Sequence, residues 1–346
     1  MKAHVSNQHD LTLNIYRSAF HKLYLCAVKQ VLIAAPISEK FKKQLVEKNY
    51  EAINYSPSGL ELPNLQPANL PPATFKLQLL EGIITSNKLL LTKSELEKYP
   101  NLRWIARLGS GMEIIDTAYC DEKGIRYFSS PSGIANSVAE HVIGMLLSLL
   151  HKIHSSNNEI KSGHWIREEN RGIELESLTV GIIGYGNTGK AVAQKLSVFT
   201  KNIFVYDKFK TNFSNQYVKE TSLEEIQNCA DIISFHVPLN SDTKHYYNDD
   251  FLSKMEKKHI LINTSRGAVA VTSTILQGLH SGKISGACLD VLEEEKNIDE
   301  LLTKDNNIVQ NLLSYNVILT PHIAGYSYNA IDKMSDELLR QIDTIL

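Results

Sequence analysis

The chain has 346 residues, a length that favours two domains, and its 43% hydrophobic and 21% charged residues are typical of a globular protein. The net charge of −2 does not favour nucleic acid or an anionic membrane as a partner, and no apolar run approaches the roughly 18 residues that span a bilayer. Four widely spaced cysteines, Cys26, Cys120, Cys229 and Cys288, form no CxxC pair. We therefore expect a reducing, cytoplasmic setting without disulfides or metal.

Residues 1–30 precede the first clear strand. They contain one acidic residue, Asp10, and their apolar patch, Leu23–Val28, is too short for the core of a secretory signal. We expect an extension without regular structure, and an acid-poor transit peptide is the alternative.

Short apolar runs alternate with helical patterns in the next hundred residues. Strands are predicted at Val31–Pro36, Gly82–Thr85 and Leu102–Leu108, and a helix at Phe41–Asn49. The proline-rich stretch Ser56–Pro72 is predicted to be a loop. Strands separated by helices predict a parallel sheet with crossover helices.

A long apolar helix is predicted over Ala135–His154, with Ser132 or Asn136 as its N-cap. The predictions then run in order: a polar irregular stretch at Ser155–Glu176, a second α/β unit from Thr179, a strand at Val317–Thr320 and a final helix at Ser327–Ile345.

A glycine-rich loop, Gly184-Tyr185-Gly186-Asn187-Thr188-Gly189, follows the predicted strand Thr179–Ile183, and a second strand ends at Asp207. The first glycine would make a tight turn, the second would let the backbone approach a pyrophosphate, and the third would let helix and strand pack closely. The helix N-terminus would offer N–H groups to the phosphates. A carboxylate at Asp207 would accept hydrogen bonds from a ribose and repel a 2′-phosphate. The sequence therefore predicts NAD rather than NADP, although Lys208 and Lys210 follow closely.

Three later segments carry residues suited to one reaction. Arg266 follows the strand Ile260–Ile262, Glu295 lies in the loop after Asp290, and His322 follows the last strand. Ligands of open α/β sheets bind at the carboxyl ends of strands. A hydroxyl gives up a hydride only as its proton leaves, and histidine suits the required base. A carboxylate would orient the imidazole, and an arginine would anchor an acid group and polarise a carbonyl. Sequence separation alone does not show that the three residues meet.

The chain resembles the D-isomer-specific 2-hydroxyacid dehydrogenase family over roughly residues 31–346. Besides the glycine loop, the matching segments are Leu108–Asp116, Asn136–His141, His236–Leu239, Asn263–Gly267, Leu289–Glu295 and Pro321–His322. The order of so many segments makes the resemblance specific. It implies an NAD-dependent oxidoreductase that transfers a hydride between nicotinamide and a D-2-hydroxy acid or its 2-keto acid.

The resemblance also implies a role for each residue. Arg266 would bind the substrate carboxylate and carbonyl, His322 would be the acid/base, and Glu295 would be its partner. The backbone N–H groups of Ser110 and Gly111 would hold the substrate carboxylate. The cofactor contacts would come from Gly184, Gly186, Asn187, Thr188 and Gly189 in the loop, from Asp207, Val237 and Pro238 at the adenosine, from Thr264 near the nicotinamide ribose, from Asp290 at the nicotinamide carboxamide, and from Gly325.

The implied α/β fold has two Rossmann-like, doubly wound parallel-sheet domains, with the cofactor domain inserted into a discontinuous substrate domain. Residues 31–132 and 323–346 would form the substrate domain, and residues 133–322 the NAD-binding domain. Family members are usually homodimers joined through their cofactor domains. The expected partners are therefore a small 2-hydroxy or 2-keto acid and a second copy of the chain, with no nucleic acid and no membrane.

The substrate is predicted less sharply. The stretch Trp165–Gly172 resembles a phosphoglycerate dehydrogenase branch, which favours 3-phosphoglycerate. However, the turn Thr85–Lys88 lacks the arginine that this branch tends to carry, and Lys88 is the only cation nearby in the sequence. A phosphate needs fixed donors, and lysine provides only a point charge. The sequence ends soon after the final predicted helix, so we expect no serine-sensing regulatory domain. Glyoxylate and hydroxypyruvate are therefore alternatives.

Two other interpretations stay open. An NAD-sensing scaffold without catalysis would keep the fold, but it has no need of Arg266, Glu295 and His322 together. A formate dehydrogenase also moves a hydride, but formate oxidation releases no hydroxyl proton and needs no Glu295–His322 couple.

Overall fold

The computed structural model describes residues 29–55, 77–87, 89–293 and 308–345. The chain divides into two compact units. The first comprises Met1–Leu108, Ile114–Ser129 and Leu338–Leu346, and the second comprises Gly109–Glu113 and Ser130–Glu337. Residues 1–28 of the predicted extension, the proline-rich loop and Glu295 lie outside the described residues.

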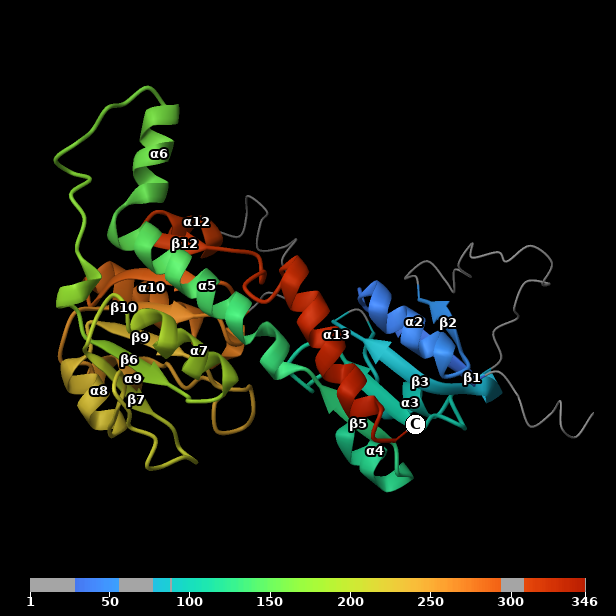
Figure 1. Cartoon of the computed structure of the whole chain (residues 1–346). Coiled ribbons are helices and arrows are strands. Elements are labelled where there is room, and N and C mark those ends of the chain that lie inside the picture. The colour runs from blue at the N-terminus through green and yellow to red at the C-terminus, as the bar shows by residue number, and fades with distance from the viewer. Residues whose placement is uncertain (1–28, 56–76, 88, 294–307, 346) are drawn as a thin grey trace, which may run out of the picture. The chain divides into compact units, whose positions relative to one another are not determined.

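Five parallel strands form the sheet of the first unit, in the order β2-β1-β3-β4-β5 (Figure 1). The strands are β1 (Lys29–Ala34), β2 (Tyr50–Asn54), β3 (Leu80–Thr85), β4 (Trp104–Arg107) and β5 (Arg126–Ser129). They are connected through α2 (Glu39–Glu47), η1 (Leu77–Leu79), α3 (Lys93–Leu96) and α4 (Thr117–Lys123). This strand order is one of the two common doubly wound arrangements.

Seven parallel strands form the sheet of the second unit, in the order β12-β11-β10-β9-β6-β7-β8. The strands are β6 (Val180–Ile183), β7 (Ile203–Tyr206), β8 (Lys219–Glu220), β9 (Ile232–Phe235), β10 (His259–Asn263), β11 (Ile284–Leu289) and β12 (Val317–Leu319). The helices are α5 (Pro131–Leu150), α6 (Ile153–Lys161), η2 (Leu175–Ser177), α7 (Asn187–Leu196), α8 (Leu223–Cys229), α9 (Asp249–Lys254), η3 (Gly267–Val269), α10 (Thr272–Ser281), α12 (Ile308–Leu313) and α13 (Tyr328–Ile342), whose last residues belong to the first unit. Two parallel, doubly wound sheets confirm the predicted fold class.

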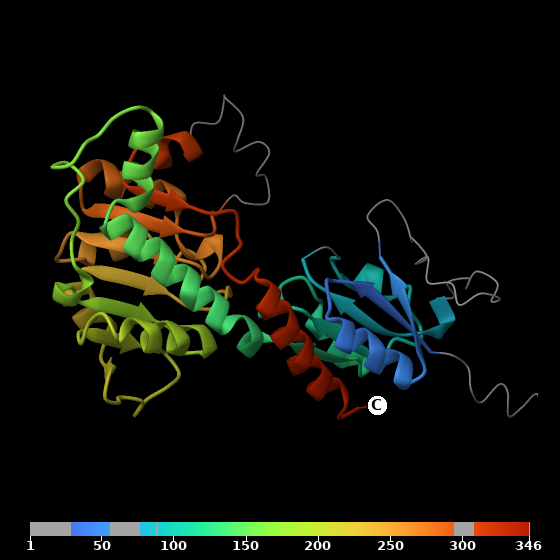
Figure 2. The ribbon, with the colours of Figure 1, turned by 45° about the horizontal axis from the view of Figure 1, so that its top comes forward.

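The seven-stranded sheet carries an apolar core on each face, because successive strand residues point to opposite sides. Ile182 and Val205 pack with α5 and α7 on one face, and Figure 2 shows both helices lying across it. Ile233 and Leu261 pack with α8, α9 and α10 on the other face. The strand order reverses between β6 and β9, and ligands of open α/β sheets bind beside the carboxyl ends at such a point.

The boundaries of the long helix differ from the prediction. α5 begins at Pro131 behind the cap residue Ser130, so the predicted N-caps Ser132 and Asn136 are wrong. Proline suits the first helical position because the N–H it lacks would have no partner there. Lys152 adopts a left-handed φ of 54° after α5, and α6 then lies in the stretch predicted to be irregular.

α5 is the one helix, within the residues that the structure describes, that is long and apolar enough to cross a membrane by length and composition. The expectation that no apolar run has this length is therefore wrong. Half of the apolar stretch is buried inside the unit, and Val138, Val142, Leu146 and Leu149 belong to the core shared with β6 and α7. Packing against the sheet accounts for the apolar character of this helix.

Candidate active site

The predicted site residues of the second unit follow the carboxyl ends of its strands. The glycine loop follows β6, Asp207 follows β7, Val237 and Pro238 follow β9, Thr264 and Arg266 follow β10, Asp290 follows β11, and His322 and Gly325 follow β12. Because the strands are parallel, these ends share one edge of the sheet. Ser110 and Gly111 belong to the same unit through their loop. The structure thus gathers these residues, while their individual roles stay predictions.

The glycine loop has the shape that a dinucleotide requires. Gly184 has a φ of 96°, and a Cβ there would lie 2.4 Å from the carbonyl oxygen of His236. A Cβ on Gly189 would lie 2.0 Å from the carbonyl oxygen of Gly184. Gly186 differs, because a Cβ there would meet no atom within 4 Å. Protein packing therefore explains two of the glycines, and the approach of a ligand to Gly186 stays a prediction. α7 begins directly after it without a side-chain cap, which leaves first-turn N–H groups for phosphates.

Asp207 ties the end of β7 to the glycine loop. Its Oδ2 accepts a hydrogen bond from Tyr185 N at 2.7 Å, and its Oδ1 accepts two from backbone N–H groups of the following turn. The two neighbouring lysines are engaged elsewhere: Lys208 pairs with Asp242, and Lys210 Nζ donates to the carbonyl of Tyr185. Asp207 is thus fixed in place as a carboxylate beside the loop.

Two polar side-chain atoms at this edge are buried without a hydrogen-bond partner among the described residues, Thr264 Oγ1 and His236 Nδ1. The other ring nitrogen of His236 lies 2.8 Å from Ser234 Oγ. Burial lowers the pKa of His236 to about 4, so its ring is neutral near pH 7. An unpartnered buried hydroxyl costs free energy unless something pairs with it. The predicted contact of Thr264 with the nicotinamide ribose would supply such a partner.

Arg266 is held by its own loop and by an unexpected carboxylate. Asn263 Nδ2 donates to the backbone carbonyl of Arg266 at 3.0 Å, and Arg266 Nη1 donates to the carbonyl of Ser265 at 2.7 Å. Arg266 Nε pairs with Glu113. Glu113 lies in the matched segment Leu108–Asp116, but sequence reasoning gave it no role.

Asp290 clamps the segment that carries His322. Its side chain is 1% exposed, and it accepts hydrogen bonds from Thr320 Oγ1 at 2.6 Å, Ile323 N at 2.9 Å and Ala324 N at 2.9 Å. His322 N donates to the backbone carbonyl of Asp290 at 2.8 Å. These bonds hold His322 at a left-handed φ of 56°, a conformation that L-residues adopt at a cost of about 1–2 kcal/mol. The carboxylate of Asp290 therefore has an internal function beside its predicted contact with nicotinamide.

His141, on α5, extends the hydrogen-bond network around Asp290 and Thr320. Its Nε2 lies 3.0 Å from Thr320 Oγ1 and 3.6 Å from Asp290 Oδ1. The Thr320 hydroxyl gives its one proton to the carboxylate, so His141 Nε2 donates to Thr320. Sequence reasoning missed this role, although His141 closes the matched segment Asn136–His141.

The first unit contains a buried cation that sequence reasoning also missed. Arg107, at the end of β4, is 5% exposed, and its guanidinium donates to the carbonyl of Leu108 at 2.7 Å and to Asn87 Oδ1 at 2.5 Å. Arg107 lies opposite Thr85 in the sheet. The turn Thr85–Lys88 therefore has a cation nearby that the sequence interpretation did not count. A charged residue inside an apolar strand was the available signal, because arginine is buried only when it is paired.

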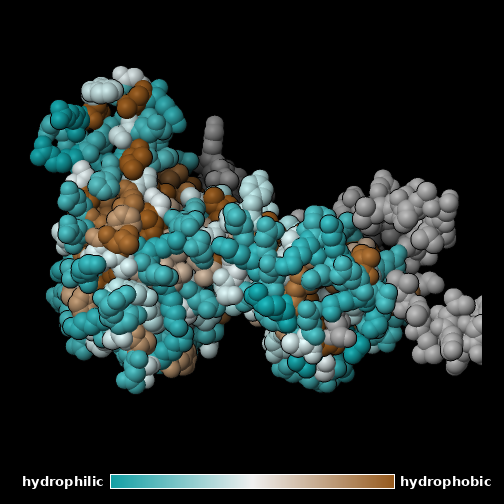
Figure 3. Space-filling model, in the orientation of Figure 1, coloured by the Kyte–Doolittle hydropathy of each residue, from teal (hydrophilic) through white to brown (hydrophobic). Residues whose placement is uncertain are grey.

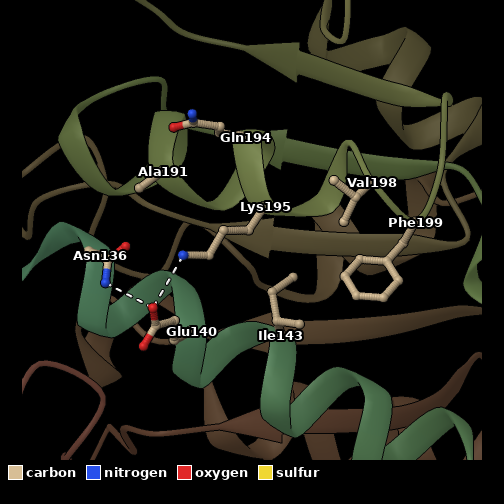
Figure 4. Close-up of a pocket in the computed structure, with 8 residues that line it drawn as sticks. All are labelled: Asn136, Glu140, Ile143, Ala191, Gln194, Lys195, Val198 and Phe199. Atoms are coloured by element: carbon tan, nitrogen blue, oxygen red, sulfur yellow. Dashed lines mark hydrogen bonds and ion pairs between the residues drawn. The ribbon is translucent and has the colours of Figure 1, made fainter.

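A surface hollow of about 510 Å³ lies between α5 and α7, and none of the predicted site residues lines it (Figure 4). Its lining comprises Asn136, Glu140, Ile143, Ala191, Gln194, Lys195, Val198 and Phe199. Lys195 of α7 donates to Glu140 across it, and Asn136 donates to Glu140 within α5. In the part of the chain that the structure describes, no group of three or more His, Cys, Asp or Glu side chains is arranged to hold a metal ion.

Known proteins share this architecture. The family model described as "D-isomer specific 2-hydroxyacid dehydrogenase, NAD binding domain" matches residues 143–324. The chain belongs to the D-isomer-specific 2-hydroxyacid dehydrogenase family. The family prediction is therefore confirmed, and the protein is an oxidoreductase acting on CH–OH groups with a nicotinamide cofactor.

Three relatives show the range within the family. The hydroxypyruvate reductase of Thermotoga maritima is 35% identical over 255 residues, which cover 73% of this chain and 80% of the relative. The D-3-phosphoglycerate dehydrogenase of Bacillus subtilis is 31% identical, over 79% of this chain and 51% of the relative. The crystal structure of an NADPH-dependent glyoxylate/hydroxypyruvate reductase from Sinorhizobium meliloti, in complex with NADP and malonate, is 25% identical, with a TM-score of 0.73 over 92% of this chain and 93% of that one.

Proposed function

We propose that this dehydrogenase uses NADH to reduce a short, unphosphorylated 2-keto acid, with hydroxypyruvate and glyoxylate as the leading candidates. The observation that carries the proposal is the fixed cation Arg266 beside Gly111, where a Cβ would lie 2.2 Å from Arg266 Nη2. A planar guanidinium next to backbone N–H groups suits a carboxylate with an adjacent carbonyl oxygen.

The residues divide the reaction between them. Arg266, with the N–H groups of Ser110 and Gly111, would bind the carboxylate and polarise the keto oxygen. NADH, held by the glycine loop, would supply the hydride for the carbonyl carbon. His322 would donate a proton to the oxygen as it becomes an alkoxide, and Glu295 would stabilise the imidazolium before that transfer. In the reverse direction, His322 would accept the proton of the hydroxyl.

The carboxylate of Asp207 supports NAD over NADP. It stands at the end of β7 beside the glycine loop, where a 2′-phosphate would meet a negative charge. Lys208 is paired with Asp242 and Lys210 with the carbonyl of Tyr185, so neither is held ready for a phosphate. Because the related Sinorhizobium meliloti enzyme is NADPH-dependent, the proposed preference for NAD needs a direct test.

The absence of a phosphate in the substrate is supported by the first unit. Beside the turn that follows β3, the guanidinium of Arg107 is buried and donates hydrogen bonds to Asn87 Oδ1 and to the carbonyl of Leu108. 3-Phosphoglycerate, which the sequence interpretation placed first, becomes the second candidate, and the stretch Trp165–Gly172 and the Bacillus subtilis relative both favour it.

A substrate panel tests the proposal. NADH consumption is followed with hydroxypyruvate, glyoxylate, pyruvate and 3-phosphohydroxypyruvate, and formate is tested with NAD. We expect kcat/KM to be highest for hydroxypyruvate or glyoxylate, about tenfold above the phosphorylated acid, as a site without fixed phosphate donors implies. A preference for 3-phosphohydroxypyruvate would assign the second candidate. NADH binding without turnover of any acid would favour a scaffold, and NADH production from formate a formate dehydrogenase.

We also propose that the protein is a homodimer joined through the second unit. Val198 and Phe199 beside the hollow, and Ile153, Ile160 and Trp165 on or next to α6, are exposed apolar residues. Figure 3 shows apolar surface on α6 and on the neighbouring face of the unit. A grouped apolar surface of this kind marks an interaction site.

A further inference from the structure

The pair formed by Arg266 and Glu113 joins two loops of the second unit that are 153 positions apart in the sequence. Glu113 ends the short segment Gly109–Glu113, and Arg266 follows β10. The Arg266 side chain is 20% exposed and the Glu113 side chain 40%. Solvent therefore reaches the carboxylate more freely than the guanidinium.

The three nitrogens of the guanidinium face different partners. Nε pairs with Glu113, and Nη1 donates to the carbonyl of Ser265. Nη2 lies beside Gly111, whose missing side chain leaves the space that Nη2 and Glu113 Oε2 occupy. Because the group is planar and rigid, fixing Nε and Nη1 also fixes the direction of Nη2.

We propose that Glu113 is a positioning residue, which aims Nη2 of Arg266 at the substrate carboxylate held by the loop at Gly111. The proposal rests on the proposed function, in which Arg266 binds the 2-keto acid. An arginine side chain has several rotatable bonds, so an anchor at Nε reduces the freedom that substrate binding must otherwise remove. The same anchor keeps the cation aligned as negative charge develops on the keto oxygen.

Glu113 also has an opposing effect. Its negative charge lies near the expected position of the substrate carboxylate, so it repels the substrate and competes with it for Arg266. Two observations make the anchoring effect the larger one. The hydrogen bond from Arg266 to Glu113 comes from Nε although Oε2 also lies beside Nη2, and the partial exposure of Glu113 lets water screen its repulsion of the substrate. Removing the carboxylate is therefore expected to harm the site rather than to free it.

The test compares Glu113→Ala, Glu113→Gln and Arg266→Ala, with Asp250→Ala as the matched control. Asp250 is also an exposed carboxylate with a basic partner, Lys254, but it lies on α9. Two readouts are used: kcat and KM for the best acid of the substrate panel, and the affinity of oxalate for the enzyme–NADH complex, measured by NADH fluorescence. Affinity for NADH itself reports whether each variant is folded.

We expect Glu113→Ala to lower kcat/KM and oxalate affinity by about tenfold or more, since small misplacements of a catalytic group have effects of this size. Glu113→Gln keeps an acceptor for Nε–H and should recover both to within about threefold of the wild type. NADH affinity should not change. A lower KM or tighter oxalate binding in Glu113→Ala would show that Glu113 competes with the substrate. A Glu113→Gln variant as impaired as Glu113→Ala would also overturn the proposal, because the hydrogen bond would not be what matters.

The Arg266→Ala variant distinguishes a failure of the positioning role from a failure of the proposed function. If Arg266→Ala keeps its oxalate affinity and turnover, the assignment of the substrate site is wrong. If Arg266→Ala loses both while Glu113→Ala matches the wild type, the site stands and only the positioning role of Glu113 fails.

Discussion

At the scale of single residues, His322 is the proposed general acid–base, and its removal should separate turnover from cofactor binding. We expect His322→Asn to lower kcat by about 10²–10⁴-fold, the usual contribution of a general acid–base group, and to leave the Kd for NADH near the wild-type value. Asparagine tolerates the left-handed backbone at this position, so the fold should be kept.

The control is His280→Asn, since His280 is an exposed histidine on α10 away from the strand ends. Steady-state NADH absorbance and a fluorescence titration of NADH give the two quantities. Unchanged turnover in His322→Asn would rule out the acid–base role.

We predict that Asp207 decides between the two nicotinamide dinucleotides. Asp207→Ala removes the charge that would repel a 2′-phosphate, so the ratio of kcat/KM for NADH to that for NADPH should fall by about tenfold, as for loss of one close charge repulsion. Asp207→Ser is the matched variant, because it keeps an acceptor for the N–H of Tyr185. If the ratio is the same in both variants as in the wild type, Asp207 does not set the preference.

At the scale of elements, the apolar pattern of the sequence located most of the strands. The elements that it missed depend on tertiary packing. β7 is the strand predicted before Asp207, whereas β2, β5, β8 and β9 were not predicted. In β5 every residue is exposed or only partly buried, so it carries no apolar run. The end of α5 was missed because Lys152 breaks the helix by a left-handed turn that its residue type does not favour.

The candidate site could be predicted as a set of strand-end residues, but not as a network. The glycine loop and Asp207 are local signals, readable from a strand followed by a turn. The contacts of His141 with Thr320 and of Glu113 with Arg266 join segments 179 and 153 positions apart. No spacing in the sequence encodes such pairs, because they follow from the order of the strands in the sheet.

The strand β10 begins with a buried histidine that should make the fold sensitive to acid. His259 Nε2 lies 2.9 Å from the hydroxyl of Tyr247, and burial lowers the pKa of His259 to about 4. The unfolded chain, in which this pKa is about 6.5, binds the proton more tightly. Stability is therefore complete above about pH 6.5 and falls as the pH drops from there towards 4, by up to about 1.4 kcal/mol per pH unit for each such histidine.

Urea unfolding at several pH values between roughly 7.5 and 4.5 measures this loss. In His259→Gln the decline should be shallower than in the wild type, while the exposed control His280→Gln should follow the wild type. Parallel curves for all three proteins would mean that His259 does not carry the effect.

At the scale of the whole molecule, the proposed dimer predicts a change of oligomeric state from one surface substitution. Val198 is 80% exposed beside the hollow between α5 and α7. Val198→Asp would bury a charge at the interface, so sedimentation should shift from dimer to monomer at micromolar concentration. Val46→Asp is the matched control, since Val46 is 64% exposed on α2 of the first unit. A wild-type monomer, or a Val198→Asp dimer, would contradict the proposed interface.

The division of the chain also has a consequence for its synthesis. The first unit contains β1, near the beginning of the described chain, and Leu338–Leu346, at its end. Gln341 donates to the carbonyl of Ser129, and Lys48 pairs with Asp343 at 3.0 Å. On the ribosome, which delivers residues in order, nearly all of the second unit is synthesised between the five strands of the first unit and its final helical turns. The unit that starts first is thus finished last, and its five-stranded sheet must stay soluble in the meantime without that cover.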